Sequence, residues 1–279
     1  MRKGRSSRRF GLHCLVSRLH AAKLVAFMAP MLLMSLAIAP ASARASTFTE
    51  SVLYSFCSQG AANCTDGSLP FASMVLAHDG NFYGTTGAGG ANAFINHVSN
   101  GDGVVFRLTP SGAETVLYNF CSQNGSSCTD GAVPTVLTEG PDGNFYSTTE
   151  FGGANGRGTI FKLTPDGTLN TLHNFCSVGG SSCTDGGGSD GGMMLGNDGN
   201  FYGTTVSGGS NGGGTIFMIT ASGLFSTLYN FCGQGGTSCT DGSGPSVPPV
   251  EGSDGYFYGV TGGGGAHGGG FRRNRECFS

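Results

Sequence analysis

Cysteine is the residue type with the clearest chemical pattern in this chain of 279 residues. Eight of the ten cysteines form four pairs in which six residues separate the partners: Cys57/Cys64, Cys121/Cys128, Cys176/Cys183 and Cys232/Cys239. An even number at a fixed spacing predicts disulfides, and pairing within each pair is the simplest of the 105 connectivities that eight cysteines allow. Zinc sites use closer spacings and converging ligands, so a metal site and free thiols are the weaker alternatives.

Aspartate recurs in two series, and every member is followed by glycine. One series follows the second cysteine of each pair, and the other precedes an aromatic run: Asp66, Asp130, Asp185 and Asp241, then Asp79, Asp142, Asp198 and Asp254. Asp-Gly favours a turn in which the carboxylate bonds its own backbone. Bound Ca²⁺ is the alternative, and a calcium loop needs several acidic ligands close in sequence. The nearest approach is Asp185-Gly-Gly-Gly-Ser-Asp190.

Other chemical patterns are incomplete. The glycine-rich loops at 152–158, 208–214 and 262–270 lead into neither Lys-Ser/Thr nor a helix, as a phosphate-binding loop would. His173 occupies a position that is tyrosine in the related segments, which predicts a packed aromatic substitute. No Gly-x-Ser-x-Gly elbow occurs, and nothing selects a pair of carboxylates for glycoside hydrolysis. The sequence therefore predicts no catalytic, cofactor-binding or metal-ligating residue.

A single non-repeating insertion, Ala91–Asp102, interrupts the first related segment. It contains Phe94, His97 and Asp102. Because loops carry binding residues more often than scaffolds do, these three residues are the candidate ligand loop. A tolerated surface insertion is the alternative.

One unit of sequence is repeated along the chain with a period of about 56 residues. Its first block is Leu-x-x-Phe-Cys, at 53–57, 117–121, 172–176 and 228–232. Its second block is Asp-Gly-Asn-Phe-Tyr-Gly-Thr-Thr or a variant, at 79–86, 142–149, 198–205 and 254–261. Its third block is Gly-Thr-Ile-Phe-Lys-Leu-Thr-Pro or a variant, at 158–165, 103–110 and 214–221. Self-similarity at a fixed period is the signature of a repeat architecture.

Each repeat unit reads as four short strands. In the second unit we expect strands at 134–139, 144–149, 158–164 and 169–175. Asp-Gly between apolar runs is a strong hairpin signal, and Phe161 and Leu163 alternate with Lys162 as on a strand with one buried face. The pattern predicts an all-β fold, a β-propeller of about four four-stranded blades, either four-bladed or truncated. A β-solenoid is the alternative.

The two ends of the repeat region, residues 46–270, predict how a propeller would close. Residues 47–56 read as a lone fourth strand, whereas the last unit has only two strands, at 247–251 and 256–261. The N-terminal strand is therefore expected to complete the last sheet. Residues 271–279 leave the pattern and are basic, which suggests a frameshift or a truncated reading frame.

Residues 1–45 differ from the remainder in charge and hydropathy. They hold eight Lys/Arg and no acid, and an apolar stretch at 24–39 leads into small residues. This pattern predicts a secretory signal peptide and is short for a membrane span. Its removal leaves 6 Lys/Arg against 17 Asp/Glu, a formal net charge of −11. That charge disfavours nucleic acid and anionic membranes as partners, and we expect an extracellular or cell-surface protein, with the periplasm as an alternative.

The repeated blocks also resemble a known family. The aromatic Asp-Gly-Asn-Phe-Tyr-Gly-Thr-Thr block, the Gly-Gly loops, the Gly-Thr-Ile-Phe-Lys-Leu-Thr-Pro block and the Leu-Tyr-Asn-Phe strand are similar to those of the GloVer tandem repeats of exported bacterial proteins. The resemblance covers about residues 48–270. It implies an exported, surface-associated repeat protein with no established catalytic role.

Three functions are compatible with these observations. The leading expectation is a binding or interaction module for a carbohydrate or protein ligand, with no cofactor and with Ca²⁺ left open. A secreted hydrolase or lyase acting on polysaccharide is the second, and a pair of carboxylates with perturbed protonation would favour it. A purely structural envelope component is the third.

Overall fold

The computed structural model describes residues 50–60, 64–92, 102–123, 127–234, 236–265 and 277–278. Within these residues the regular structure consists of β-strands and two short 3-10 turns, Gly180–Ser182 and Gly236–Ser238. No helix in the described part of the chain is long and apolar enough to cross a membrane. The all-β fold predicted from the repeats is confirmed.

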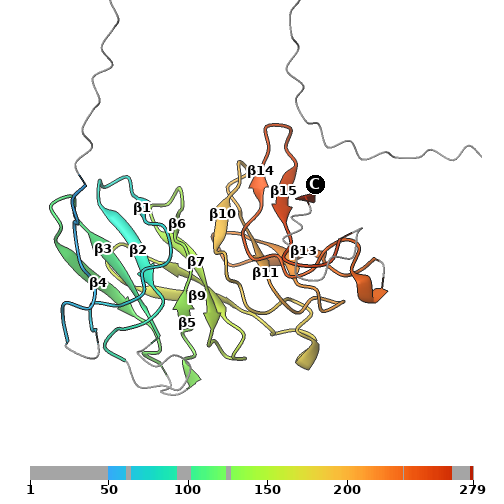
Figure 1. Cartoon of the computed structure of the whole chain (residues 1–279), viewed down its shortest axis with the longest axis horizontal. Helices are drawn as coiled ribbons and strands as arrows, with labels where there is room; N and C mark the ends of the chain where they lie inside the picture. Colours follow the sequence, from blue (N-terminus) through green and yellow to red (C-terminus); the bar gives the residue numbers. More distant parts are fainter. Residues whose placement is uncertain are drawn as a thin grey trace, which may run out of the picture. The chain divides into compact units, whose positions relative to one another are not determined.

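Each repeat unit forms its own antiparallel sheet, in which the strands lie side by side in chain order (Figure 1). The first sheet contains β1 (Val75–Leu76), β2 (Phe82–Thr86), β3 (Val104–Leu108) and β4 (Glu114–Asn119). The second contains β5 (Ala132–Pro134), β6 (Thr138–Glu139), β7 (Phe145–Phe151), β8 (Thr159–Leu163) and β9 (Leu169–Asn174). The third contains β10 (Met193–Leu195), β11 (Phe201–Thr205), β12 (Thr215–Ile219) and β13 (Phe225–Asn230). The last contains β14 (Val250–Glu251), β15 (Phe257–Val260) and β16 (Cys277–Phe278).

The third and fourth strands of the first three sheets share one irregularity. The register shifts at Val105/Phe106, Ile160/Phe161 and Ile216/Phe217, the same position of each repeat. Such a bulge increases the local twist of a sheet. On the third strands, the expected alternation is confirmed, because Phe161 and Leu163 are buried whereas Lys162 is half-buried.

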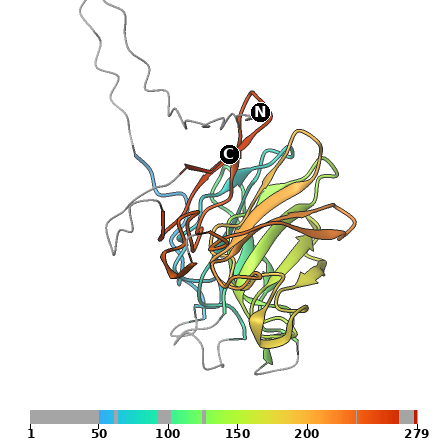
Figure 2. The same ribbon diagram turned by 90° about the vertical axis from the view of Figure 1, so that its right-hand side faces the viewer.

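Consecutive sheets pack face to face through a ladder of aromatic pairs. Tyr83 stacks on Phe145 with ring centroids 4.1 Å apart, and Tyr146 stacks on Phe201 at the same distance. Tyr202 meets Phe257 at 4.4 Å. Figure 2 shows the sheets from the side, each built of strands that reverse at hairpins. In the first three sheets every ladder stays within one repeat unit, as in propeller blades and unlike the alternative, a β-solenoid.

One expected strand of the second unit differs from the prediction. The strand expected at 134–139 is divided into β5 and β6, which pair with opposite ends of β7. Val133 has a φ of 56°, a left-handed conformation that is unusual for a β-branched residue. Pro134 has no N–H to donate to the ladder. Both features interrupt a continuous strand.

The expected closure of the last sheet by the N-terminal strand is not observed, so that prediction is wrong. Residues 50–56 contain no strand, and the last sheet instead gains β16, whose Cys277 and Phe278 pair with Val260 and Gly259. Tyr54 and Phe56 pack on the first sheet, where Phe56 meets Phe106 at 4.7 Å. Phe56 thus contacts the first sheet as Phe120, just after β4, contacts Phe161 of the second sheet. Within residues 50–56 the segment therefore packs through its aromatic side chains and forms no ladder.

Candidate functional site

Three of the four disulfide loops follow the outer strand of a repeat, and the first follows the segment 50–56. The structure pairs the cysteines as the sequence predicts, within each repeated Cys-x6-Cys segment and with Cα atoms 4.0–4.1 Å apart. The carbonyl of Cys183 accepts bonds from the N–H groups of Gly186 and Gly209, both at 2.8 Å. The loop is therefore fastened to the glycine corner that follows β11.

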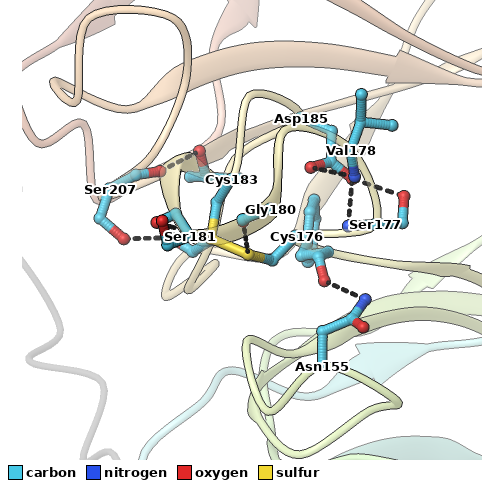
Figure 3. Close-up of a disulfide and its surroundings, with 12 residues drawn as sticks. Asn155, Cys176, Ser177, Val178, Gly180, Ser181, Cys183, Asp185 and Ser207 are labelled. Atoms are coloured by element: carbon cyan, nitrogen blue, oxygen red, sulfur yellow. Dashed lines mark hydrogen bonds between the residues drawn. A yellow bond between two sulfur atoms is a disulfide. The ribbon is translucent and has the colours of Figure 1, made fainter.

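One aspartate of the first series holds each loop in shape by accepting bonds from backbone N–H groups seven and eight residues earlier, whereas the sequence predicts bonds within its own turn. In Figure 3, Asp185 accepts bonds from the N–H of Ser177 at 3.0 Å, from its hydroxyl at 2.8 Å and from the N–H of Val178 at 3.3 Å. Nε2 of His173 lies 3.1 Å from the same carboxylate. The equivalent pairs are Tyr54/Asp66, Tyr118/Asp130 and Tyr229/Asp241. These oxygens are surrounded by donors, an arrangement for holding a loop rather than a Ca²⁺ ion.

His173 has the structural role that its place in the repeat predicts. Its ring stacks on Phe225 with centroids 3.9 Å apart. Burial lowers its pKa, against the opposing charge of Asp185. The imidazole is therefore uncharged at neutral pH and packs as an aromatic ring.

The second aspartate series closes the hairpin between the first two strands of each sheet. Oδ1 of Asp142 accepts the N–H of Asn144 at 3.2 Å, and Oδ2 accepts from Tyr146 and Lys162, both at 2.8 Å. Burial would raise the pKa of Asp142, but these donors hold it well below its usual range. Asp79, Asp198 and Asp254 make the same tyrosine bond. This series also serves the scaffold.

One group of potential metal ligands involves a disulfide. Asp102, Cys121 and Cys128 have ligand atoms within 4.8 Å of one another and are all buried. The two sulfurs are bonded to each other, so neither is a thiolate. The trio does not have the donor set of a metal centre.

The insertion singled out in the sequence stays a prediction. Phe94 and His97 lie outside the described residues. Asp102 is described, and only 1% of it is exposed. Its carbonyl accepts the N–H of Val133 at 2.9 Å, so its backbone ties the first repeat to the second.

Two adjoining polar cavities lie at the junction of the second and third repeats, and Arg157 and Ser207 line both. The larger has a volume of about 350 Å³ and is also lined by Ser181, Ser182 and Ser210. The smaller has a volume of about 180 Å³, and Glu150, Phe151 and Asp190 contribute to it. We call the two together the junction cleft. Figure 3 shows Ser207 beside the Cys176–Cys183 loop that forms one wall.

The junction cleft is where this repeat departs from the others. Glu150 stands where the neighbouring units have Gly87 and Val206, and Phe151 stands where they have Ala88 and Ser207. Arg157 replaces Asp102 and Gly213. Asp190, five residues after the aspartate that follows the second cysteine, corresponds to Phe71, Thr135 and Ser246, none of which is charged.

The charges of the junction cleft are not neutralised by one another. Burial raises the pKa of Glu150, and the charge of Asp190 adds to this. Burial also raises the pKa of Asp190. Within the described ranges, the ion pairs closer than 4.0 Å involve His78, Lys162 and His173, and none involves the cleft residues. The cleft thus offers two carboxyls, one guanidinium, several hydroxyls and an aromatic ring that is 41% exposed.

These groups can bind a polar ligand. A serine nucleophile needs a neighbouring base, and the two described histidines lie elsewhere: His78 binds Glu139 at 3.0 Å and His173 binds Asp185. Sequence reasoning did not find the cleft, because it searched for motifs shared by the repeats. The signal was the reverse, namely two carboxyls, Glu150 and Asp190, where the other units have uncharged residues.

Comparison with known proteins gives fold-level likeness and one family match. No curated protein matches the chain. A candidate gluconolactonase aligns at 16% identity and a TM-score of 0.42, over 68% of this chain and 57% of its own. A candidate 6-phosphogluconolactonase from Bacteroides uniformis aligns at 17% identity and 0.38, over 70% and 51%. The PQQ-bound aldose sugar dehydrogenase from Streptomyces coelicolor aligns at 14% identity and 0.39, over 70% and 57%.

The chain thus spans between 51% and 57% of the length of these three solved proteins, and likeness at this level says nothing of its chemistry. The family match is of another kind. The model of the Gloeobacter/Verrucomicrobia repeat covers residues 93–274, which include the second and third sheets and the junction cleft. The chain belongs to the Gloeobacter/Verrucomicrobia repeat family.

Proposed function

We propose that this chain is an exported carbohydrate-binding module whose ligand site is the junction cleft. The observation that supports it is the convergence of Glu150, Phe151, Arg157 and Asp190 on adjoining cavities, although the other repeats hold uncharged residues in place of Glu150 and Asp190. The scaffold needs no charge in place of Glu150 or Asp190, since the other units pack without one there. Residues that depart from a repeat in one place are best explained by a ligand.

The chemistry of the cleft suits a sugar. A saccharide presents hydroxyls that donate and accept hydrogen bonds and an apolar ring face. Carboxylates accept from hydroxyls, and Arg157 and the serines donate to ring and hydroxyl oxygens. The exposed Phe151 ring offers a surface for the apolar face. The larger cavity, of about 350 Å³, lies in the range of small-ligand sites.

Export is part of this proposal. The basic, apolar and small-residue order of residues 1–45 supports a leader. Four disulfides are consistent with an oxidising compartment. A carbohydrate ligand at the cell surface or outside the cell would then be accessible to the cleft.

A glycan array tests the proposal. The chain, produced with its own leader into an oxidising compartment, is compared with the variants Glu150→Val and Phe151→Ala. These substitutions are drawn from Val206 and Ala88 of the sister repeats, so the fold accommodates them. Wild type should bind selectively, and both variants should lose about ten-fold in affinity or more.

The matched control is Phe71→Ala, which removes another exposed aromatic ring from outside the cleft. It should bind as wild type does. Absence of glycan binding by a folded, oxidised protein would overturn the proposal and favour a structural envelope role. Binding that survives both cleft substitutions would place the site elsewhere.

A second candidate function is polysaccharide cleavage. The observation that favours it is the pair Glu150 and Asp190. Burial raises both pKa values, and the charge of Asp190 raises that of Glu150 further. Incubation with the array-selected glycan should release reducing ends if the pair works as acid and base. Loss of that release in both Glu150→Gln and Asp190→Asn would establish catalysis. If the glycan is unchanged after prolonged incubation, cleavage is excluded and binding remains as the function of the cleft.

A further inference from the structure

Arg157 is the residue around which the junction cleft is built, since it lines both cavities. Its carbonyl accepts the N–H of Gly188 at 3.0 Å, which fixes the backbone at this point. Its stem passes over Gly187, where an added methyl group would meet Cβ and Cδ of Arg157 at 3.6 Å. The side chain therefore lies along the junction of the two repeats.

Among the residues that the structure describes, no carboxylate lies within 4.0 Å of the Arg157 guanidinium, although two carboxyls line the same cleft. Lys162, by contrast, is paired with Asp142 at 2.8 Å. Arg107 lies on the first sheet, where its charge acts on Asp79. Among the described Lys and Arg side chains, Arg157 is thus the one whose charge remains for a ligand in the cleft.

We propose that the junction cleft binds an acidic saccharide, with the carboxylate of a uronic acid residue on Arg157. This inference rests on the proposed carbohydrate-binding function and names the ligand class. The planar guanidinium donates two parallel hydrogen bonds to a carboxylate. The hydroxyls of the same sugar donate to Glu150 and Asp190, and the ring packs on Phe151.

A single carboxylate fits this cleft better than a multiply charged group. Glu150 and Asp190 would repel a phosphate or sulfate cluster, and the chain after residue 45 has a formal net charge of −11. The raised pKa values of the two carboxyls mean that they accept a proton more readily than usual. Protonation would lessen the repulsion that a ligand carboxylate meets. Affinity for the acidic sugar should therefore increase as the pH falls from neutral toward mildly acidic values.

The test compares three ligands of equal length by titration calorimetry. They are a galacturonic acid trisaccharide, its fully methyl-esterified form and a neutral galactose trisaccharide. The full oxidised chain should bind the acid about ten-fold more tightly than the ester, the loss expected for one charge-assisted pair of hydrogen bonds. The Arg157→Gln variant should lose this preference, and Arg157→Lys should retain only part of it because lysine lacks the planar fork.

The charge control is Arg107→Met, which copies Met218 of the third repeat and removes a positive charge outside the cleft. It should keep the full preference for the acid. Equal binding of acid and ester, or loss of the preference in Arg107→Met, would overturn this inference. If the neutral trisaccharide or another neutral glycan bound in a manner sensitive to Glu150→Val, the proposed function would stand while the uronate inference fell. If no glycan bound at all, both would fall.

Discussion

Carboxyl side chains serve two purposes in this protein. Asp185 and Asp142, and their counterparts in the other repeats, are surrounded by N–H and O–H donors and hold loops and turns. Asp190 and Glu150 have raised pKa values and face a cavity. Position in the repeat, and not residue type, distinguishes scaffold carboxylates from those available to a ligand.

Glu114 is a carboxyl at a place where the other repeats are apolar. It begins β4, whereas β9 begins with Leu169 and β13 with Phe225. Its Oε1 is buried and has no hydrogen-bond partner among the described residues. Burial, with the charge of Asp66, raises the pKa of Glu114 to about 7. The charged form is therefore disfavoured beneath the N-terminal segment.

This placement predicts a pH-dependent stability. A carboxyl whose folded pKa exceeds its unfolded value stabilises the fold when protonated, and that contribution is lost as the pH rises through about 7. The variant Glu114→Gln should therefore be more stable than wild type at pH 8, by about 1 kcal/mol after allowance for solvent screening. Urea unfolding across the range between pH 5 and pH 8 measures the difference.

The control is Glu50→Gln, which removes an exposed carboxyl from the N-terminal segment. Its unfolding should follow wild type at every pH. A difference between Glu114→Gln and wild type that is constant from pH 5 to pH 8 would contradict the assigned titration.

At the scale of elements, the disulfide loop is the unit that connects one sheet to the next. Cys183 ties the loop to the Gly208–Gly209 corner through its carbonyl, and Asp185 fills the interior of the loop. The same arrangement recurs in each repeat, with Cys64, Cys128 and Cys239 in the corresponding role. The cleft wall formed by Ser181 and Ser182 depends on it.

Removal of one disulfide should weaken the fold without abolishing it. The paired substitutions Cys176→Ser and Cys183→Ser open a loop with a sequence separation of 7. In the chain-entropy model the loss is about 2.5 kcal/mol. Urea unfolding of the oxidised variant against oxidised wild type measures it. A variant as stable as wild type would show that the hydrogen bonds alone close the loop.

Replacement of the aspartate inside the loop should have a comparable effect. In Asp185→Asn an NH₂ takes the place of one carboxylate oxygen, so it faces the N–H of either Ser177 or Val178. We expect a loss of about 2 kcal/mol, since buried donors lose a charged partner. Asp190→Asn, five residues on, removes a carboxyl that lines the cleft and should leave thermal unfolding within about 0.5 kcal/mol of wild type. Equal losses of stability in Asp185→Asn and Asp190→Asn would refute the distinction between a scaffold carboxylate and a cleft carboxyl.

At the scale of the whole molecule, stability depends on contacts between neighbouring repeats. Phe175 is fully buried and meets Phe217 of the next repeat at 5.4 Å. The Tyr-Phe stacks continue this pattern through all four sheets. One repeat cannot bury both faces of its sheet alone, so each repeat stabilises its neighbours.

A core substitution at one junction should therefore be costly. Phe175→Ala is expected to reduce the free energy of unfolding by about 3–5 kcal/mol, because it removes a fully buried ring between two sheets. Leu224→Ala, at a site 67% exposed, should change it by less than about 0.5 kcal/mol. Calorimetric unfolding of both variants compares them. A small effect of Phe175→Ala would contradict coupling between the second and third repeats.

The sequence predicts the repeats, the pairing of the cysteines and the strand order, because each is encoded several times over. Where a feature is encoded once, prediction is poorer. Residues 50–56 have the sequence of a fourth strand, but they form no ladder and instead pack on the first sheet through Tyr54 and Phe56. The junction cleft combines Glu150 and Arg157 with Asp190 from the following repeat, and only packing brings these residues together.

Hydrogen exchange of the oxidised chain, with and without a glycan selected from the array, tests most directly that the junction cleft is the ligand site. We predict slower exchange on binding at residues 150–157 and 207–210, with no change at the corresponding corners of the first and last repeats. Slower exchange confined to residues 91–102, the insertion of the first repeat, would contradict the account and return the ligand site to that loop.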